Sequence, residues 1–233
     1  SDGTYENIVG ATSSTYTLTS NEVAKYIKVV VTGTGNYTGT QASSPTTQIE
    51  DPDWITIGTQ TWAKKNLNVG AMVTGITEQI NNSTIEKYCY NNDEANCTTY
   101  GALYQWDEAM NYSTTEGAQG ICPTGSHVPS DNEIKILEMQ LGMTQAQADA
   151  TDWRGTDQGA QMEVGGTSGL NIPLAGYRSG SGSFGLLSSS AFLWSSSESS
   201  VSAWSRNLSS SYTTVSRPTL TKAFGFSVRC LGN

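Results

Sequence analysis

The stretch WSSSESSVSAWSRNLSSSYTTVSRPTLTKAFGFSVRCLGN, residues 194–233, alternates between two kinds of position. Successive side chains of a β-strand point to opposite faces of the sheet. Trp204 and Arg206 therefore share one face of a predicted strand, while Ser205 and Asn207 share the other. The first set is large and suits a packed interior, whereas the second is small and polar. We therefore predict that the second face lies open to solvent and displays its side chains instead of forming a catalytic pocket.

The predicted display surface consists of the small and aromatic side chains of this stretch that fall outside the packed set. Its residues are Ser205, Asn207, Ser209, Ser211, Tyr212, Ser216, Pro218, Leu220 and Phe224. Exposed Tyr, Leu and Phe beside serines have the composition of adaptable binding surfaces. A solvated low-complexity loop is the alternative interpretation of the same composition.

The composition of the chain favours a strand-rich and loop-rich protein over a helical bundle. Of its 233 residues, 14% are charged and 24 are Gly, and Ser and Thr are abundant. The net charge of -9 and the sequence pI of about 4.5 argue against a nucleic-acid partner, because phosphates would be repelled. No apolar run reaches the roughly 18 residues of a membrane span. The polar start SDGTYENIVG predicts no signal peptide in the sequence.

Residues 1–50 differ from residues 51–233 and predict a separate, small all-β segment. They contain neither Cys nor Trp. TYTLTS and KYIKVVVTG indicate short alternating strands, and TGTGNYTGT has the Gly and Asn content of a hairpin turn. Pro45 and Pro52, within SSPTTQIEDPDW, are typical of an exit strand and a linker.

Residues 51–233 predict an irregular α+β domain. In DWITIGTQTWAKKNLNVG, two short strands flank a tight turn at Gly58. Apolar residues at helical spacing predict one helix over residues 100–112. A second helix is predicted to follow Ser130, an N-cap residue whose capping-box partner is Glu133. Two helices among many short strands and long loops define the expected fold class.

The four cysteines, Cys89, Cys97, Cys122 and Cys230, indicate two disulfides in this acidic, Ser-rich chain. Four cysteines allow three connectivities. We favour Cys89–Cys97 with Cys122–Cys230, because the first pair closes the short polar loop CYNNDEANC. Four reduced and buried thiols are the alternative. Metal ligation is disfavoured, because the chain has no CxxC motif and a single His.

The loop CYNNDEANC also contains side-chain oxygens of the kind that Ca²⁺ binds, from Asn91, Asn92, Asp93 and Glu94. The EF-hand pattern is absent, so a solvated disulfide loop is favoured and Ca²⁺ is the alternative. His127 lies in a loop just before the second predicted helix, and no nucleophile is linked to it by spacing. A structural role is therefore favoured over catalysis or metal binding.

Residues 54–233 resemble the FISUMP family, named for the major paralogous domain of Fibrobacter succinogenes. The matching motifs are TIGTQTWAKKNLNVG, KYCYNNDEANCTTYGALYQWDEAM, EGAQGICPTGSHVPSDNE, LAGYR, LWSSSES and GFSVRC. The resemblance implies an extracellular domain related to the C-type-lectin and formylglycine-generating-enzyme folds. In those folds a C-terminal strand returns to pair near the start of the domain, which agrees with a Cys122–Cys230 bond.

Two further resemblances concern function. The stretch 197–220 is similar in composition to the variable segments of C-type-lectin-fold proteins diversified by retroelements, whose mutagenesis yields Ser, Asn, Tyr and Thr codons. GATSSTYTLTSNEVAKYIKVVVTGTGNYTGT and the closing TTQI resemble bacterial immunoglobulin-like repeats of surface proteins. Together they imply a partial immunoglobulin-like segment followed by a domain that displays a variable face.

The leading hypothesis is a secreted or cell-surface protein that binds a protein or carbohydrate ligand on another cell or surface. It would catalyse no reaction, bind no nucleic acid and insert into no membrane. A carbohydrate-binding or adhesion module of fixed specificity is the alternative. A formylglycine-generating type of enzyme is a third hypothesis, disfavoured because its catalytic motif is not evident in the sequence.

Overall fold

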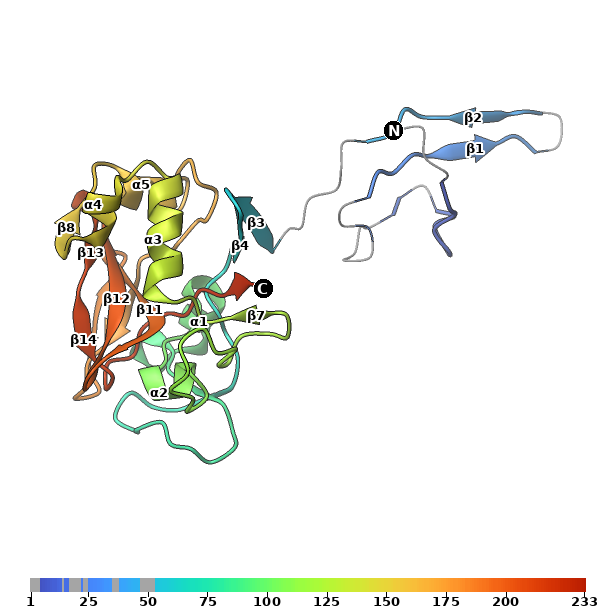
Figure 1. The fold of residues 1–233 in the computed structure, drawn as a ribbon. Helices are drawn as coiled ribbons and strands as arrows, with labels where there is room; N and C mark the ends of the chain where they lie inside the picture. The colour runs from blue at the N-terminus through green and yellow to red at the C-terminus, as the bar shows by residue number, and fades with distance from the viewer. Residues whose placement is uncertain (1–4, 14, 17–21, 23–24, 35–37, 47–52) are drawn as a thin grey trace. The chain divides into compact units, whose positions relative to one another are not determined.

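The computed structural model describes residues 5–13, 15–16, 22, 25–34, 38–46 and 53–233. The chain divides into two compact units, Ser1–Pro52 and Asp53–Asn233 (Figure 1). Each is described by itself.

The first unit contains a short antiparallel pair among its described residues. Strand β1 (Val30–Thr32) pairs with β2 (Thr40–Ala42), with Val31 opposite Gln41. The side chains of these strands are exposed. Most of the predicted strand TYTLTS and of the closing TTQI lies outside the described residues, so the immunoglobulin-like segment remains a prediction.

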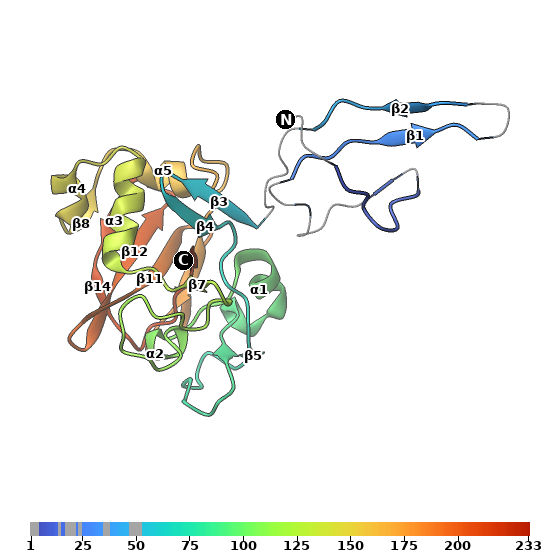
Figure 2. The same ribbon diagram turned by 45° about the vertical axis from the view of Figure 1, so that its right-hand side comes forward.

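A small sheet joins the two ends of the second unit. Strand β3 (Trp54–Ile57) turns at Gly58, which has a φ of 61°, into β4 (Gln60–Ala63). The C-terminal strand β15 (Leu231–Gly232) pairs with β4 on one side and with β7 (Ser126–His127) on the other. The C-terminus accordingly lies beside β7 and β4 (Figure 2). The predicted turn at Gly58 and the predicted return of the C-terminal strand are both confirmed.

A large sheet forms the body of the second unit. Its order is β10 (Phe184–Leu187), β9 (Ala175–Arg178), β11 (Ser190–Ser199), β12 (Ser202–Ser209), β13 (Tyr212–Arg217) and β8 (Asp152–Arg154). Strand β14 (Thr219–Thr221) pairs with the first half of β12, and β13 with the second half. Pro218 separates β13 from β14 because it cannot donate to the ladder. A parallel pair, β5 (Ala71–Met72) with β6 (Glu86–Lys87), lies apart from this sheet.

The helices of residues 53–233 are short and more numerous than expected. They are the 3₁₀ helix η2 (Tyr90–Asn92), α1 (Glu94–Tyr100), α2 (Trp106–Ala109), α3 (Asp131–Gln140), α4 (Gln145–Asp149) and α5 (Gln158–Met162). The loop CYNNDEANC is thus largely helical.

The single helix predicted over residues 100–112 is present only in part, as α2 (Trp106–Ala109). Gly101, with a φ of 82°, ends α1. Leu103 and Tyr104 are extended and form bridges with Tyr88 and Phe226. Those long-range bridges override the helical spacing of the apolar residues, which serve here as core contacts.

The predicted start of α3 is confirmed. The Ser130 hydroxyl accepts from the Glu133 backbone N–H, and the Glu133 carboxylate accepts from the Ser130 backbone N–H at 2.8 Å. This reciprocal capping box satisfies two backbone donors that the helix itself leaves unpaired. It sets where α3 begins, and therefore which of its residues face the sheet.

The large sheet is packed on both faces, as alternation along β11 shows. Ala191 and Leu193 join Leu137 of α3 in one apolar cluster, and α3 lies against this face (Figure 1). Phe192 and Trp194 point the other way, into a cluster that includes Phe226 and both disulfides. The second cluster covers only part of its face, which leaves the rest of that face open.

Both expected disulfides are present. Cys89 is bonded to Cys97 and Cys122 to Cys230, and all four residues are buried. Disulfides are typical of proteins that mature in an oxidising, extracytoplasmic environment. Over the described residues, no helix has both the length and the apolar character needed to cross a bilayer.

Candidate binding surface

The open part of the second face is formed by β12, β13 and β8; we call it the outer face. Asn207 of β12 lies opposite Ser216 of β13, and Ser216 lies opposite Trp153 of β8. Further along, Ser209 pairs with Tyr212. Because paired residues share a face, Asn207, Ser216 and Trp153 lie on one side of the sheet. Ser209 and Tyr212 share a face beyond a shift in the strand register.

The residues predicted for display occupy this face to different depths. Ser211 and Tyr212 are exposed. The half-buried members are Asn207, Ser209, Pro218, Leu220 and Phe224.

Ser205 and Ser216 correct the prediction, because both are buried. The Ser205 hydroxyl and backbone N–H both donate to the Pro218 carbonyl, at 3.3 and 3.0 Å, where the chain crosses from β13 to β14. Small polar residues at these positions serve packing of the sheet, and a ligand cannot reach them. The predicted binding surface therefore loses these two serines and keeps its other members.

The most exposed aromatic contact on the outer face is a stacked pair. The rings of Trp153 and Tyr212 lie 4.5 Å apart at an interplanar angle of 27°, and 38% and 54% of the two residues are exposed. Two large rings held together at the surface present a rigid apolar platform that loses little entropy on binding a ligand.

Trp153 was not found by sequence reasoning. Its strand is only three residues long, and the preceding Asp152 has a φ of 56°, so no alternating pattern marks it. The only signal is an isolated Trp in a polar, Gly-containing segment. That signal does not distinguish an exposed ring from a buried one. Strand pairing with β13 is what brings Trp153 to the predicted surface.

Leu220 and Phe224 form the opposite end of this surface. Leu220 lies opposite Ala203 on β12, and both it and Phe224 pack against the buried aromatic cluster. Phe224 also contacts Tyr177, with ring centroids 5.8 Å apart. This end is apolar and held in place by the core below it, whereas Asn207 and Ser209 supply polar groups between the two ends. The Oδ1 of Asn207 is buried and has no hydrogen-bond partner among the residues that the structure describes.

A buried ion network supports the sheet from its other face. Arg206 donates to Glu138 and to Asp131, at 2.7 Å each. Arg217 donates to Asp131 at 2.6 Å, and Arg154 to Glu138 at 2.6 Å. Burial alone would raise the pKa of Asp131, but hydrogen bonds and charge from the two arginines outweigh it and lower that pKa to about 2. The network fixes β12, β13 and β8 onto α3.

The candidate Ca²⁺ ligands do not converge on one point. Asn92 Oδ1 accepts from the Gly75 N–H at 2.7 Å, and Asp93 Oδ1 accepts from the Ala95 N–H at 3.0 Å, as the N-cap of α1. Glu94 pairs with Lys87. Within the described part of the chain, no group of three His, Cys, Asp or Glu side chains is placed to hold a metal ion.

His127 joins the small sheet to the start of α3. Its Nδ1 lies 2.7 Å from Asn233 Oδ1, and its Nε2 lies 3.0 Å from Glu133 Oε1. Both ring nitrogens are therefore engaged in structural contacts between β7, the C-terminus and the α3 capping box.

A model of the Fibrobacter succinogenes major domain matches residues 55–231. The match covers well over half of the chain and confirms the family expected from the sequence motifs. The comparison with curated proteins and the comparison with solved structures gave no match.

Proposed function

The chain belongs to the Fibrobacter succinogenes major domain family, and from this membership we propose that it is a secreted or surface-displayed protein that binds a ligand through its outer face. The stacked Trp153–Tyr212 pair is the observation that carries the proposal. Large rings are normally buried, and exposed ones that are rigidly held are enriched where proteins bind partners. Ser209, Ser211 and Asn207 add uncharged polar groups beside the rings.

We propose binding without a chemical step. The disulfides lie inside the core, with Cys89 and Cys97 at most 1% exposed and Cys122 and Cys230 at most 3%. Burial of this kind supports a structural role for the cysteines over the oxidase hypothesis. The pairing of β15 with β4 supports a fold of the C-type-lectin type for residues 53–233.

Variation at Ser209, Ser211, Tyr212, Leu220 and Phe224 is the finer proposal. These positions are supported from below, so their side chains can change while the sheet persists. Sequencing the DNA around the coding region tests it. A near-identical repeat beside a reverse-transcriptase gene is expected, and a locus without such a repeat favours the alternative, a carbohydrate-binding or adhesion module of fixed specificity.

An array carrying purified bacterial surface polysaccharides and secreted proteins tests the binding itself. We expect the wild-type protein to bind some of the spots, and Trp153→Ala with Tyr212→Ala to reduce the signal on them by roughly tenfold or more, as for other aromatic anchor residues. Tyr26→Ala, which removes an aromatic ring that is 43% exposed elsewhere, is the matched control and should bind as the wild type does. Equal signals from the wild type and the double variant would overturn the proposal.

A further inference from the structure

A concave site in residues 53–233 shares no residue with the outer face. It is a pocket of about 330 Å³, near the lower end of the roughly 300–1,000 Å³ typical of ligand sites. It is lined by Lys64, Lys65, Asn66, Asn68, Cys97, Thr98, Thr99, Tyr100, Gly101, Val164, Asn171 and Pro173. The lining contains two lysines and no carboxylate, in a chain whose net charge is -9.

Two asparagines of this lining bind the end of α1. Asn66 Nδ2 donates to the Tyr100 carbonyl at 2.9 Å, and Asn68 Nδ2 donates to the Cys97 carbonyl at 3.1 Å. The Tyr100 carbonyl, in the last turn of the helix, has no intrahelical donor, whereas the Cys97 carbonyl also accepts from the Gly101 N–H at 3.0 Å. With these hydrogen bonds neither carbonyl is left as a bare acceptor that would repel an anion in the pocket.

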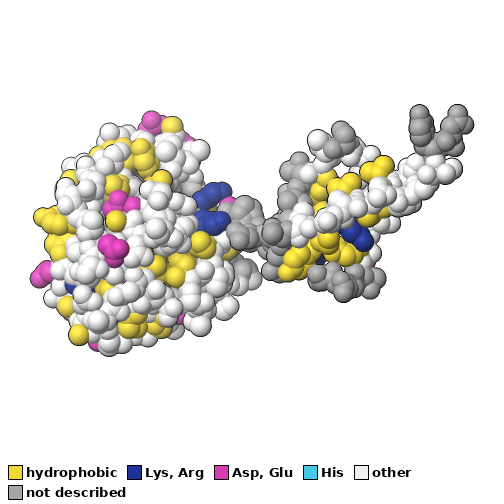
Figure 3. All heavy atoms as spheres, turned by 90° about the horizontal axis from the view of Figure 1, so that it is seen from above, with side chains coloured by type: hydrophobic (Ala, Val, Ile, Leu, Met, Phe, Trp, Pro, Cys, Tyr) yellow, Lys and Arg dark blue, Asp and Glu magenta, His cyan; other side chains and the backbone are white. Residues whose placement is uncertain are grey.

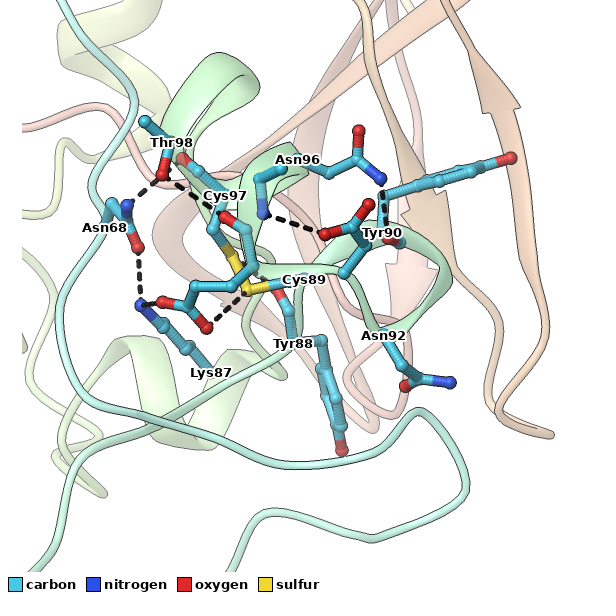
Figure 4. Close-up of a disulfide and its surroundings, with 12 residues drawn as sticks. Asn68, Lys87, Tyr88, Cys89, Tyr90, Asn92, Asn96, Cys97 and Thr98 are labelled. Atoms are coloured by element: carbon cyan, nitrogen blue, oxygen red, sulfur yellow. Dashed lines mark hydrogen bonds and ion pairs between the residues drawn. A yellow bond between two sulfur atoms is a disulfide. The ribbon is translucent and has the colours of Figure 1, made fainter.

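Each of these asparagines also accepts a hydrogen bond from a cation. Lys87 Nζ donates to Asn68 Oδ1 at 2.9 Å (Figure 4), and Arg229 Nε donates to Asn66 Oδ1 at 3.1 Å. Lys87 is balanced by Glu94, whose carboxylate lies 2.6 Å from it.

Among the described residues, no carboxylate pairs with Arg229. Its remaining hydrogen bonds go to the carbonyls of Ala63 and Leu170, and its Nη2 is buried without a partner. Burial lowers the pKa of its guanidinium to about 9. A buried positive charge without a carboxylate raises the potential of the surface next to it, and Asn66 forms that surface.

The rim adds positive charge that solvent can reach. Lys65 Nζ lies 2.7 Å from Asp53, and the two side chains are 78% and 58% exposed. Exposed pairs of this kind contribute little to stability, so a ligand can exchange for Asp53 at small cost. On the face of residues 53–233 that Figure 3 shows, the visible Lys and Arg side chains gather mainly at one spot.

We propose that this pocket binds a sugar that carries a carboxylate group, as in a uronic acid. The carboxylate pairs with Lys65, above the floor that Asn66 forms over Arg229. The hydroxyls of Thr98 and Thr99 donate to the carbonyls of Glu94 and Ala95, at 3.3 and 2.9 Å, and accept from the sugar hydroxyls. Val164 and Pro173 contact the C–H groups of the sugar. Cations along one wall of the pocket attract an anionic ligand, so the pocket should bind an acidic sugar more tightly than a neutral one.

Titration of the full chain with glucuronate and with glucose, followed by backbone amide NMR shifts, tests the proposal. We expect glucuronate, and not glucose, to shift the amides of Thr98, Thr99 and Asn171. Raising the salt from about 20 mM to about 300 mM should increase the Kd of glucuronate roughly threefold or more. Lys65→Met should increase the Kd roughly three- to tenfold by removing a charge-assisted contact.

Two further variants complete the test. Lys25→Met removes the same charge from an exposed position in the first unit and should leave the Kd unchanged. Thr99→Trp places a bulky ring in the pocket and should abolish the shifts. Equal binding of glucose and glucuronate, tighter binding of glucose 6-phosphate, or an unchanged Kd in Lys65→Met would each overturn the proposal. Tyr212→Ala changes the outer face and no residue of the pocket, so it should leave the Kd of glucuronate unchanged.

Discussion

Asp131 is one of the two carboxylates, with Glu138, that join the arginines of the buried ion network. Its two carboxylate oxygens accept from Arg206 and Arg217, which lie on neighbouring strands. Removing one partner of a buried pair leaves the other charges uncompensated. Asp131→Asn should therefore destabilise the second unit by about 3–5 kcal/mol, measured by urea unfolding.

The matched control for this prediction is Asp149→Asn. Asp149 also pairs with a cation, Lys135 at 3.0 Å, but its side chain is 51% exposed. Its loss should leave the unfolding midpoint close to that of the wild type, since exposed pairs contribute little. Similar effects of the two substitutions would show that the network does not hold α3 to the sheet.

The lowered pKa of Asp131 also predicts how the stability of the protein depends on pH. Its pKa is about 2 in the folded protein, below the ordinary aspartate value of 3.8. A group whose pKa is lowered by folding stabilises the folded state above its unfolded pKa, and this contribution is lost as the pH falls. The free energy of unfolding should therefore decrease as the pH falls from about 4 to about 2. Carboxyl NMR titration of the wild type measures the pKa directly, and a midpoint near 4 would contradict the prediction.

At the scale of elements, the two disulfides should differ in what they contribute. Cys122–Cys230 spans 108 residues, whereas Cys89–Cys97 spans 8. Loop entropy in the unfolded chain predicts roughly 4.7 kcal/mol for the long loop and about 2.5 kcal/mol for the short one.

Paired Cys→Ser variants measure this difference. Both bonds lie in the same buried cluster, so each double variant loses comparable packing and the comparison isolates the loop term. Chemical denaturation should show the larger loss for Cys122→Ser with Cys230→Ser. A larger loss for the short loop would indicate that local strain or packing, rather than chain entropy, dominates.

Elements with a local chemical signature could be predicted from the sequence. The capping box at Ser130 and the Gly58 turn depend on neighbours in the chain, and both are present. The helix predicted over residues 100–112 is reduced to α2 because Leu103 and Tyr104 form bridges with Tyr88 and Phe226. Likewise, alternation identified the outer face of β12, but the depth of Ser205 depends on Pro218, thirteen residues later.

At the scale of the whole molecule, the family and the return of the C-terminal strand were accessible from sequence motifs. The stacked aromatic pair and the lysine-rimmed pocket were not. Trp153 reaches Tyr212 through pairing between separate strands, and the pocket combines residues from 64 to 173. Such juxtapositions follow from tertiary contacts, which a pattern along the chain does not encode.

The Cys122–Cys230 bond has a mechanical consequence. Strands β8 to β14 all lie within the covalent loop that it closes. Tension applied across residues 53–233 would first separate β15 from β4, where Leu231 faces Trp62, and would then pass through the sulfur–sulfur bond. The large sheet would bear none of that pull, so a protein tethered by these ends would keep its outer face folded while residues 53–122 are stretched.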